Sequence, residues 1–184
     1  MTISNGDKMP AGSFKVMTSD GVNDMSTDDL FAGKKVALFS VPGAFTPTCS
    51  NEHLPSYLKN YDAIKAKGFD TIACMAVNDA FVMKAWGEDR GVGDKIVMLA
   101  DGNGDYTKAL GLELDAAGFG LGTRGKRFSV VVNDGVAEQV NIGLRDADTG
   151  LGMTAGLSMA FIAIIADRIL RGYANSLGTT DIRD

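Results

Sequence analysis

The chain has 184 residues, of which 45% are apolar and 22% are charged, and its formal net charge is −5. This length and composition suit a single globular domain over residues 1–184 and argue against a disordered chain. The acidic balance argues against nucleic acid and anionic membrane surfaces as partners, because both attract basic faces.

The ends of the chain and its cysteines indicate the compartment. Residues 1–7 carry no basic segment followed by an apolar run, so we expect no secretion signal. The longest apolar stretch, Leu157 to Leu170, is interrupted by polar residues and is too short to span a bilayer. Two cysteines, Cys49 and Cys74, do not make the disulfide framework of a secreted protein. We therefore expect a reducing compartment, the cytoplasm.

Apolar periodicity and turn residues predict the elements of the first half. In chain order they are an N-terminal β-hairpin around residues 14–22, a polar turn over 26–33, strands over 35–41 and 69–77, and helices over 49–67 and 79–90. The strand over 35–41 reads as a central strand that is buried on both faces. In the last helix, the predicted apolar side contains Phe81, Val82, Ala85 and Trp86.

The second half continues the pattern and completes a fold. Its predicted elements are a strand over 95–100, a short helix over 105–111, a Gly-rich loop over 113–125, a hairpin over 127–142 and an amphipathic helix over 154–171. Strand–helix–strand units followed by a hairpin and a last helix are the order of an α/β thioredoxin-like fold. We therefore expect a central mixed sheet flanked by helices.

Three sequence patterns resemble ligand-binding motifs, but each lacks residues that its motif requires. Gly120–Lys126 matches a phosphate loop, yet Arg127 stands where Ser or Thr is required, so a mobile surface loop is expected. Residues 101–112 begin like a calcium loop but lack its Gly and its final Glu. Cys49 and His53 would supply too few ligands for a metal site. We expect neither nucleotide nor metal.

The stretch Pro42–Cys49 lies between the first central strand and the first long helix. Its Pro, Gly and Thr residues fit neither element, so it predicts a loop whose backbone N–H groups are exposed and bind anions. The loop ends in Cys49, whose neighbours Thr48, Ser50 and Asn51 are polar. Such surroundings are typical of a reactive thiol rather than of a structural one.

The chemistry of that thiol calls for a cation. Thr46 stands where a C-x-x-C motif has its first cysteine, so Cys49 is left to act as a single nucleophile. Bringing an ordinary thiol mostly to its thiolate at pH 7 takes about 3 kcal/mol, and a helix N-terminus supplies only about 0.3–1 kcal/mol. The candidate cations are Arg124, Lys126, Arg127 and Arg145. A guanidinium at the head of a strand adjacent to the first one, as at Arg127, can reach the helix N-terminus.

These residues resemble the peroxidatic motif of the peroxiredoxins, in the peroxiredoxin 5 or type II branch. The motif is Pro-x-x-x-Thr-x-x-Cys, which ends here at Cys49 in the string Val-Pro-Gly-Ala-Phe-Thr-Pro-Thr-Cys-Ser. The resemblance covers most of residues 35–145. Further similar strings occur at His53–Pro55, Ala76–Val82, Lys84–Trp86, Leu99–Gly102 and Lys126–Ser129.

The resemblance implies an antioxidant thiol peroxidase that reduces hydrogen peroxide and alkyl hydroperoxides without a metal, haem or flavin cofactor. It implies a sulfenic acid intermediate and a homodimer, with Phe45 and the Phe81–Trp86 region near the interface. It also assigns roles to site residues: Cys49 is the peroxidatic nucleophile, Thr46 holds the peroxide, Pro42 shields the thiolate, Arg127 polarises the peroxide and favours the thiolate, and His53 and Gly43 support them.

Reduction of the sulfenic acid stays open between two routes. Residues 149–159 contain no cysteine, although animal members of the branch carry a resolving one near the last helix. Cys74 lies 25 residues after Cys49, a spacing similar to that of plant type II members, where the second cysteine can form an intramolecular disulfide. Its place in mid-strand equally predicts an inert core thiol. In that case glutathione, glutaredoxin or thioredoxin must reduce the enzyme.

Two other functions fit a thioredoxin-like fold. One is a disulfide reductase or redox sensor, which predicts that peroxide consumption survives the loss of Cys49. The other is a holdase that binds proteins through an exposed apolar face of residues 157–165.

Overall fold

The computed structural model describes residues 1–143, which lie within one compact unit, Met1–Asp146. The predicted helix over 154–171, the apolar face of 157–165 and the candidate cation Arg145 fall outside the described residues. Within residues 1–143, no helix is both long and apolar enough to cross a bilayer.

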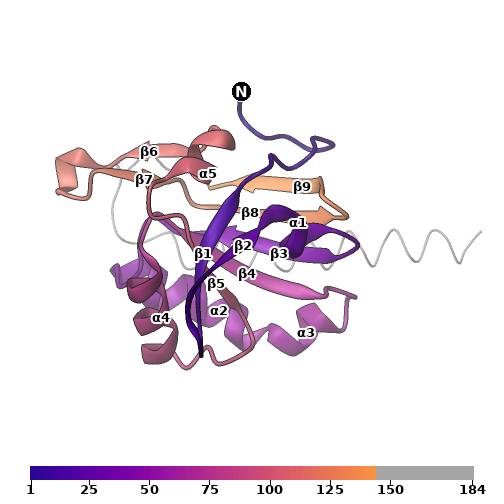
Figure 1. Cartoon of the computed structure of the whole chain (residues 1–184), viewed down its shortest axis with the longest axis horizontal. Coiled ribbons are helices and arrows are strands. Elements are labelled where there is room, and N and C mark those ends of the chain that lie inside the picture. Colours follow the sequence, from indigo (N-terminus) through magenta and orange to yellow (C-terminus); the bar gives the residue numbers. More distant parts are fainter. Residues whose placement is uncertain (144–184) are drawn as a thin grey trace, which may run out of the picture. The chain divides into compact units, whose positions relative to one another are not determined.

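A seven-stranded sheet forms the centre of the unit (Figure 1). Its strands are β1 (Ser13–Thr18), β2 (Gly21–Ser26), β3 (Lys35–Ser40), β4 (Thr71–Ala76), β5 (Val97–Ala100), β8 (Phe128–Asn133) and β9 (Val136–Ile142). Their order is β2-β1-β5-β4-β3-β8-β9, with β3, β4 and β5 parallel and all other pairs antiparallel. The predicted mixed sheet, the N-terminal hairpin and the central place of the first apolar strand are confirmed.

Five α-helices and two short helical turns connect these strands. They are α1 (Thr27–Phe31), a π-helical turn (Cys49–His53), α2 (Leu54–Lys59), α3 (Tyr61–Lys65), α4 (Ala80–Asp89), α5 (Asp105–Ala109) and a 3₁₀ turn (Ala117–Phe119). The helix predicted over 49–67 is therefore present but segmented. Asn60 separates α2 from α3 because its backbone, at φ −100° and ψ 12°, leaves the helical region.

Alternation along β3 and β4 divides the core into two layers. On one face, Leu38 and Met75 pack with residues of α1 and α5. On the other face, Phe39 and Cys74 pack with residues of α2, α3 and α4, the helices that lie together on one side of the sheet in Figure 1. The second layer also contains Cys49, so the two cysteines share one apolar cluster.

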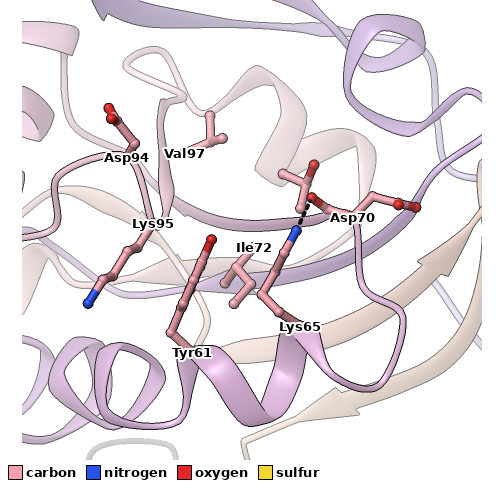
Figure 2. Close-up of a pocket in the computed structure, with 8 residues that line it drawn as sticks. Tyr61, Lys65, Asp70, Ile72, Asp94, Lys95 and Val97 are labelled. Carbon is pink, nitrogen blue, oxygen red and sulfur yellow. Dashed lines mark hydrogen bonds between the residues drawn. The ribbon is translucent and has the colours of Figure 1, made fainter.

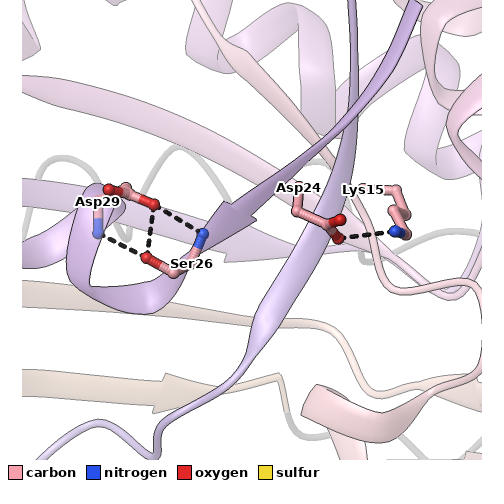
Figure 3. Close-up of polar contacts among 4 residues, drawn as sticks. All are labelled: Lys15, Asp24, Ser26 and Asp29. Carbon is pink, nitrogen blue, oxygen red and sulfur yellow. Dashed lines mark hydrogen bonds and ion pairs between the residues drawn. The ribbon is translucent and has the colours of Figure 1, made fainter.

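The segment over 26–33 is the helix α1, so the predicted polar turn is wrong. Ser26 accepts a hydrogen bond from the backbone of Asp29, and the Asp29 carboxylate accepts one from the backbone of Ser26, at 3.1 Å each (Figure 3). This is a capping box with Asp in place of the usual Glu or Gln. Figure 3 also shows the Lys15–Asp24 ion pair that joins β1 to β2 at 2.7 Å.

Two further predictions need correction. The predicted loop over 113–125 contains β6 (Glu113–Asp115) and β7 (Thr123–Gly125), which pair antiparallel, so Gly120–Lys126 is partly a strand. In α4 the buried face consists of Ala80, Met83, Trp86 and Gly87, whereas Phe81 is 69% exposed and Ala85 is exposed. Apolar character alone did not reveal which side faces the sheet.

Candidate active site

The loop from Pro42 to Cys49 leaves the end of β3 and is fixed by its own polar groups. The Thr46 hydroxyl donates to the carbonyl of Gly43 at 2.8 Å, and the Ala44 N–H donates to the Asn78 side chain at 3.0 Å. Between them, Phe45 adopts a left-handed backbone with φ 60°, which is strained for a bulky residue. These contacts hold a turn that would otherwise open.

Cys49 begins one turn of π-helix, in which the Leu54 N–H donates to the Cys49 carbonyl. Such turns are frequent at functional sites because they reposition side chains within a helix. Here the turn places Cys49 and His53 around the same guanidinium, that of Arg127. The next residue, Ser50, accepts a hydrogen bond from the buried Trp86 indole at 3.0 Å, which ties the turn to α4.

The Arg127 guanidinium contacts both Cys49 and His53. One guanidinium nitrogen, Nη2, donates to the Sγ atom of Cys49 at 3.3 Å, and the other, Nη1, lies 2.6 Å from Nδ1 of His53. Arg127 immediately precedes β8, which pairs with β3, so the guanidinium starts beside the strand that leads into the loop. The expectation that a cation from an adjacent strand reaches the thiol is confirmed for this residue.

In this cluster the Arg127 guanidinium faces the sulfur of Cys49 and a neutral histidine. Burial and the neighbouring Arg127 lower the pKa of His53 to about 3, so this histidine is neutral at physiological pH. Its Nδ1 atom therefore accepts from Arg127 and its proton resides on Nε2. Among the described residues Arg127 forms no ion pair with a carboxylate. Its positive charge is thus directed at Cys49, whose residue surface is only 1% exposed.

Aromatic packing fixes the orientation of His53. The ring lies edge-on to Phe39 and to Tyr57, with centroids 5.3 Å and 5.6 Å away. Phe39 and Tyr57 are themselves stacked, with centroids 3.8 Å apart. The imidazole cannot swing away from Arg127 without disturbing this stack, so His53 acts as a rigid acceptor.

The sequence also predicted Pro42, Gly43 and Arg124 as candidates for the site. Pro42 is half-buried at the start of the loop and Gly43 is buried within it. The Arg124 guanidinium donates to the backbone carbonyls of Val77 and Leu121 rather than to Cys49. Sequence reasoning missed Asn78, whose side chain accepts a hydrogen bond from the loop backbone, while Asp79 caps α4.

Cys74 occupies a different environment. It lies in the middle of β4, opposite Phe39 of β3 and Met98 of β5, and it is 0% exposed. Burial raises the pKa of the Cys74 thiol well above its usual range. A thiol in this state is a poor nucleophile.

A cavity of about 110 Å³ lies elsewhere (Figure 2). Its lining comes from α3, from the start of β4 and from the approach to β5, including Tyr61, Lys65 and Lys95. Cys49 follows the opposite end of the parallel strands. The cavity therefore does not belong to the thiol site. Within residues 1–143, no group of three or more potential ligands could hold a metal ion.

Comparisons with known proteins agree with this geometry. The redoxin family model matches residues 4–169. The chain is 47% identical to Peroxiredoxin-2B of Arabidopsis thaliana over 72% of its own length and 82% of the relative's. It is 44% identical to the chloroplastic Peroxiredoxin-2E of the same plant over 77% of its length, and the match spans 62% of that relative, less than two thirds. Reduced Prx3 from Vibrio vulnificus, solved with hydrogen peroxide, is 45% identical and superimposes with a TM-score of 0.77, covering 86% of this chain and 99% of that one.

Proposed function

Because this chain belongs to the peroxiredoxin family, within the redoxins, we propose that it is a thiol-dependent peroxidase of antioxidant defence. The substrates are hydrogen peroxide and alkyl hydroperoxides. The observation that carries the proposal is the contact of Arg127 Nη2 with Cys49 Sγ at 3.3 Å. It places a permanent cation against a thiol that has no other polar side chain bonded to it among the described residues.

The reaction is a displacement at oxygen. The Cys49 thiolate attacks one peroxide oxygen, so that an S–O bond forms while the O–O bond breaks. Sulfur is oxidised by two electrons to a sulfenic acid, and the distal oxygen leaves as water or alcohol after taking up a proton. Arg127 stabilises the negative charge that spreads over both oxygens, and its second nitrogen is held in place by His53.

Thr46 orients the peroxide through its lone pairs. Because its hydroxyl proton is already committed to the Gly43 carbonyl, the oxygen can only accept from an incoming peroxide O–H. Pro42 shields the thiolate from water at the start of the loop. Gly43 supplies the carbonyl that sets the orientation of Thr46.

An external thiol returns Cys49 to its reduced form. A first thiol attacks the sulfenic acid and releases water, and a second thiol reduces the resulting mixed disulfide. The burial of Cys74, which raises the pKa of its thiol, supports this route over an intramolecular disulfide, because a buried neutral thiol is a poor nucleophile. We propose glutathione, glutaredoxin or thioredoxin as the reductant.

Mass spectrometry after one equivalent of hydrogen peroxide tests the reaction. We expect one added oxygen on the Cys49 peptide and an unmodified Cys74 peptide. The control is the Cys49→Ser variant, which should consume no peroxide. Peroxide consumption that persists in this variant would instead favour a disulfide reductase or sensor that bears its activity elsewhere. A loss of two hydrogens, joining the two peptides, would show that Cys74 resolves the sulfenic acid.

We also propose a homodimer that uses the rim of the active-site loop. Phe45 is 51% exposed on the loop and Phe81 is 69% exposed at the start of α4. The backbone of Ala44 and the side chain of Asn78 bring these two segments together. Trp86 is fully buried, so within the expected interface region the contact comes from Phe81 rather than from Trp86.

The dimer is tested by light scattering at micromolar concentration. The wild type should have the mass of two chains, and Phe81→Asp should shift the mass toward one. Val22→Asp, which changes an exposed apolar residue on the β1–β2 hairpin, should leave the mass unchanged. A monomeric wild type would contradict the proposal.

A reducing compartment such as the cytoplasm completes the proposal. Both cysteines are free and buried, and the catalytic cycle needs a thiol reductant. Imaging of a tagged chain in its host cell would test it.

A further inference from the structure

Arg124 lies only three residues before Arg127 but forms hydrogen bonds with different partners. Its side chain donates from Nη1 to the carbonyl of Val77 at 2.8 Å and from Nε to the carbonyl of Leu121 at 2.9 Å. Val77 directly follows β4, and Leu121 lies in the connection between β6 and β7. One planar guanidinium thus joins the C-terminal end of β4, in the central sheet, to the small two-stranded sheet.

The same guanidinium lies against the active-site loop. A Cβ atom added to Gly43 would stand 3.4 Å from Nη1 of Arg124, 3.3 Å from Cγ2 of Thr46 and 3.8 Å from Oδ1 of Asn78. The absence of a side chain at Gly43 is therefore what lets the loop backbone pack onto Arg124. Asn78, which follows Val77 in the chain, binds the next loop residue, Ala44.

These contacts support a strained turn. Phe45 has a left-handed backbone, and the Thr46 hydroxyl donates to the carbonyl of Gly43. A strained conformation persists where its surroundings over-determine it. The side chains of Arg124 and Asn78 both border the turn at Gly43 from outside the loop.

We propose that Arg124 is a positioning residue of the peroxidase reaction: it braces the Gly43 turn so that Thr46 presents its lone pairs to a peroxide at Cys49. The inference rests on the proposed function. Arg124 contacts neither the sulfur nor His53, both of which bind Arg127. We expect its loss to change the geometry of the bound peroxide while the contact of Arg127 with Cys49 remains.

The reactions of Cys49 with two electrophiles distinguish an effect on peroxide positioning from an effect on the thiol itself. The rate of Cys49 oxidation by hydrogen peroxide depends on peroxide positioning, whereas alkylation by iodoacetamide depends only on an ionised, reachable thiol. In Arg124→Met we expect the peroxide rate constant to fall roughly ten- to a hundredfold, with the iodoacetamide rate unchanged. Arg124→Lys, which keeps the charge but cannot bridge both carbonyls, should fall between. Lys108→Met, which removes an exposed charge on α5, is the matched control and should react like the wild type.

The two measured rates either support the role of Arg124 or overturn it. Equal peroxide rates in Arg124→Met and the wild type overturn the inference, and so does a parallel fall of both rates, which would indicate general damage to the fold. If circular dichroism shows that Arg124→Met is unfolded, Arg124→Lys carries the test, because a lysine cannot bridge both carbonyls. A wild-type peroxide rate in Arg124→Lys then overturns the inference. A wild-type chain that does not react with peroxide overturns the proposed function itself.

Discussion

The two cysteines are equally buried, yet their surroundings differ in kind. Cys49 is 1% exposed at the start of a helical turn, and a guanidinium lies 3.3 Å from its sulfur. Cys74 is 0% exposed in the middle of a strand, and strands pair with it on both sides. Both belong to one apolar cluster. Burial therefore does not distinguish the two thiols, whereas the polar groups near each sulfur do.

This difference follows from where each residue falls in its element. A strand commits its backbone groups to its neighbours, and the Cys74 side chain lies in an apolar cluster. The first turn of a helix leaves N–H groups without internal partners, and a side chain from an adjacent strand can approach it. Arg127 makes that approach from the residue before β8. Substitutions that weaken these features should therefore separate the two thiols experimentally.

Removing the charge at Arg127 should produce the largest effect. In Arg127→Gln the thiolate and the transition state both lose their cation, and we expect the peroxide rate constant to fall roughly 10²–10³-fold. Arg127→Lys should recover part of the rate, because an ammonium keeps the charge but cannot contact Cys49 and His53 together. Stopped-flow kinetics give the rates, and absorbance at 240 nm reports thiolate. Arg90→Gln, on the far end of α4, is the control; a fall of less than tenfold in Arg127→Gln would remove the distinction between the thiols.

His53 should make the fold acid-sensitive. The unfolded chain protonates an ordinary histidine near pH 6.5, whereas folded His53 protonates at about pH 3. Between these values the unfolded state binds more protons, so stability is lost as pH falls. From pH 7.5 to 5.0 the expected loss from this residue is about 2 kcal/mol. Urea unfolding of the wild type and of His53→Gln at both pH values measures the difference. An equal loss in the two proteins would show that His53 is not buried in its neutral form.

Much of this site could be predicted from the sequence because its chemistry is local. The Thr46-to-Cys49 spacing and the polar residues after Cys49 indicated the candidate nucleophile, and the energy of ionisation required a distant cation such as Arg127. The alternating elements and the hairpin that begins at Arg127 followed from the apolar runs and their turn residues. These inferences needed only residue types, periods and charge.

The rest depended on contacts between residues far apart in the chain. Nothing near Arg124 indicates that it would bind the carbonyl of Val77, 47 residues away. The π-helical turn at Cys49 leaves no periodicity that separates it from an α-helix. The capping box at Ser26 was missed because Asp29 stands where Glu or Gln is usual. Phe81 was placed on the wrong face because an exposed aromatic residue looks like core in a sequence.

Loss of the Ser50–Trp86 hydrogen bond should moderately lower the free energy of unfolding. Ser50→Ala leaves the indole N–H of Trp86 buried without its acceptor, which costs about 1–2 kcal/mol. The free energy of unfolding from urea titration measures this cost. Trp86→Phe in the Ser50→Ala background removes the donor as well, and a double-mutant cycle then separates the hydrogen bond from the packing of the ring. Additive effects of the two changes would show that the contact does not couple α4 to the catalytic turn.

Cys74 should give the smallest effect on reactivity. In Cys74→Ala we expect the rate of Cys49 oxidation and the turnover with an external thiol to stay within twofold of the wild type, because no polar group of the site contacts Cys74 among the described residues. The lost sulfur leaves a small cavity, which should lower the free energy of unfolding by about 1 kcal/mol. Single-turnover kinetics and urea titration measure the two effects separately. Complete loss of turnover with unchanged Cys49 oxidation would mean that Cys74 leaves β4 during the cycle and resolves the sulfenic acid. In that case two equally buried thiols would both react, and the stability of β4, rather than the polarity around sulfur, would control the second.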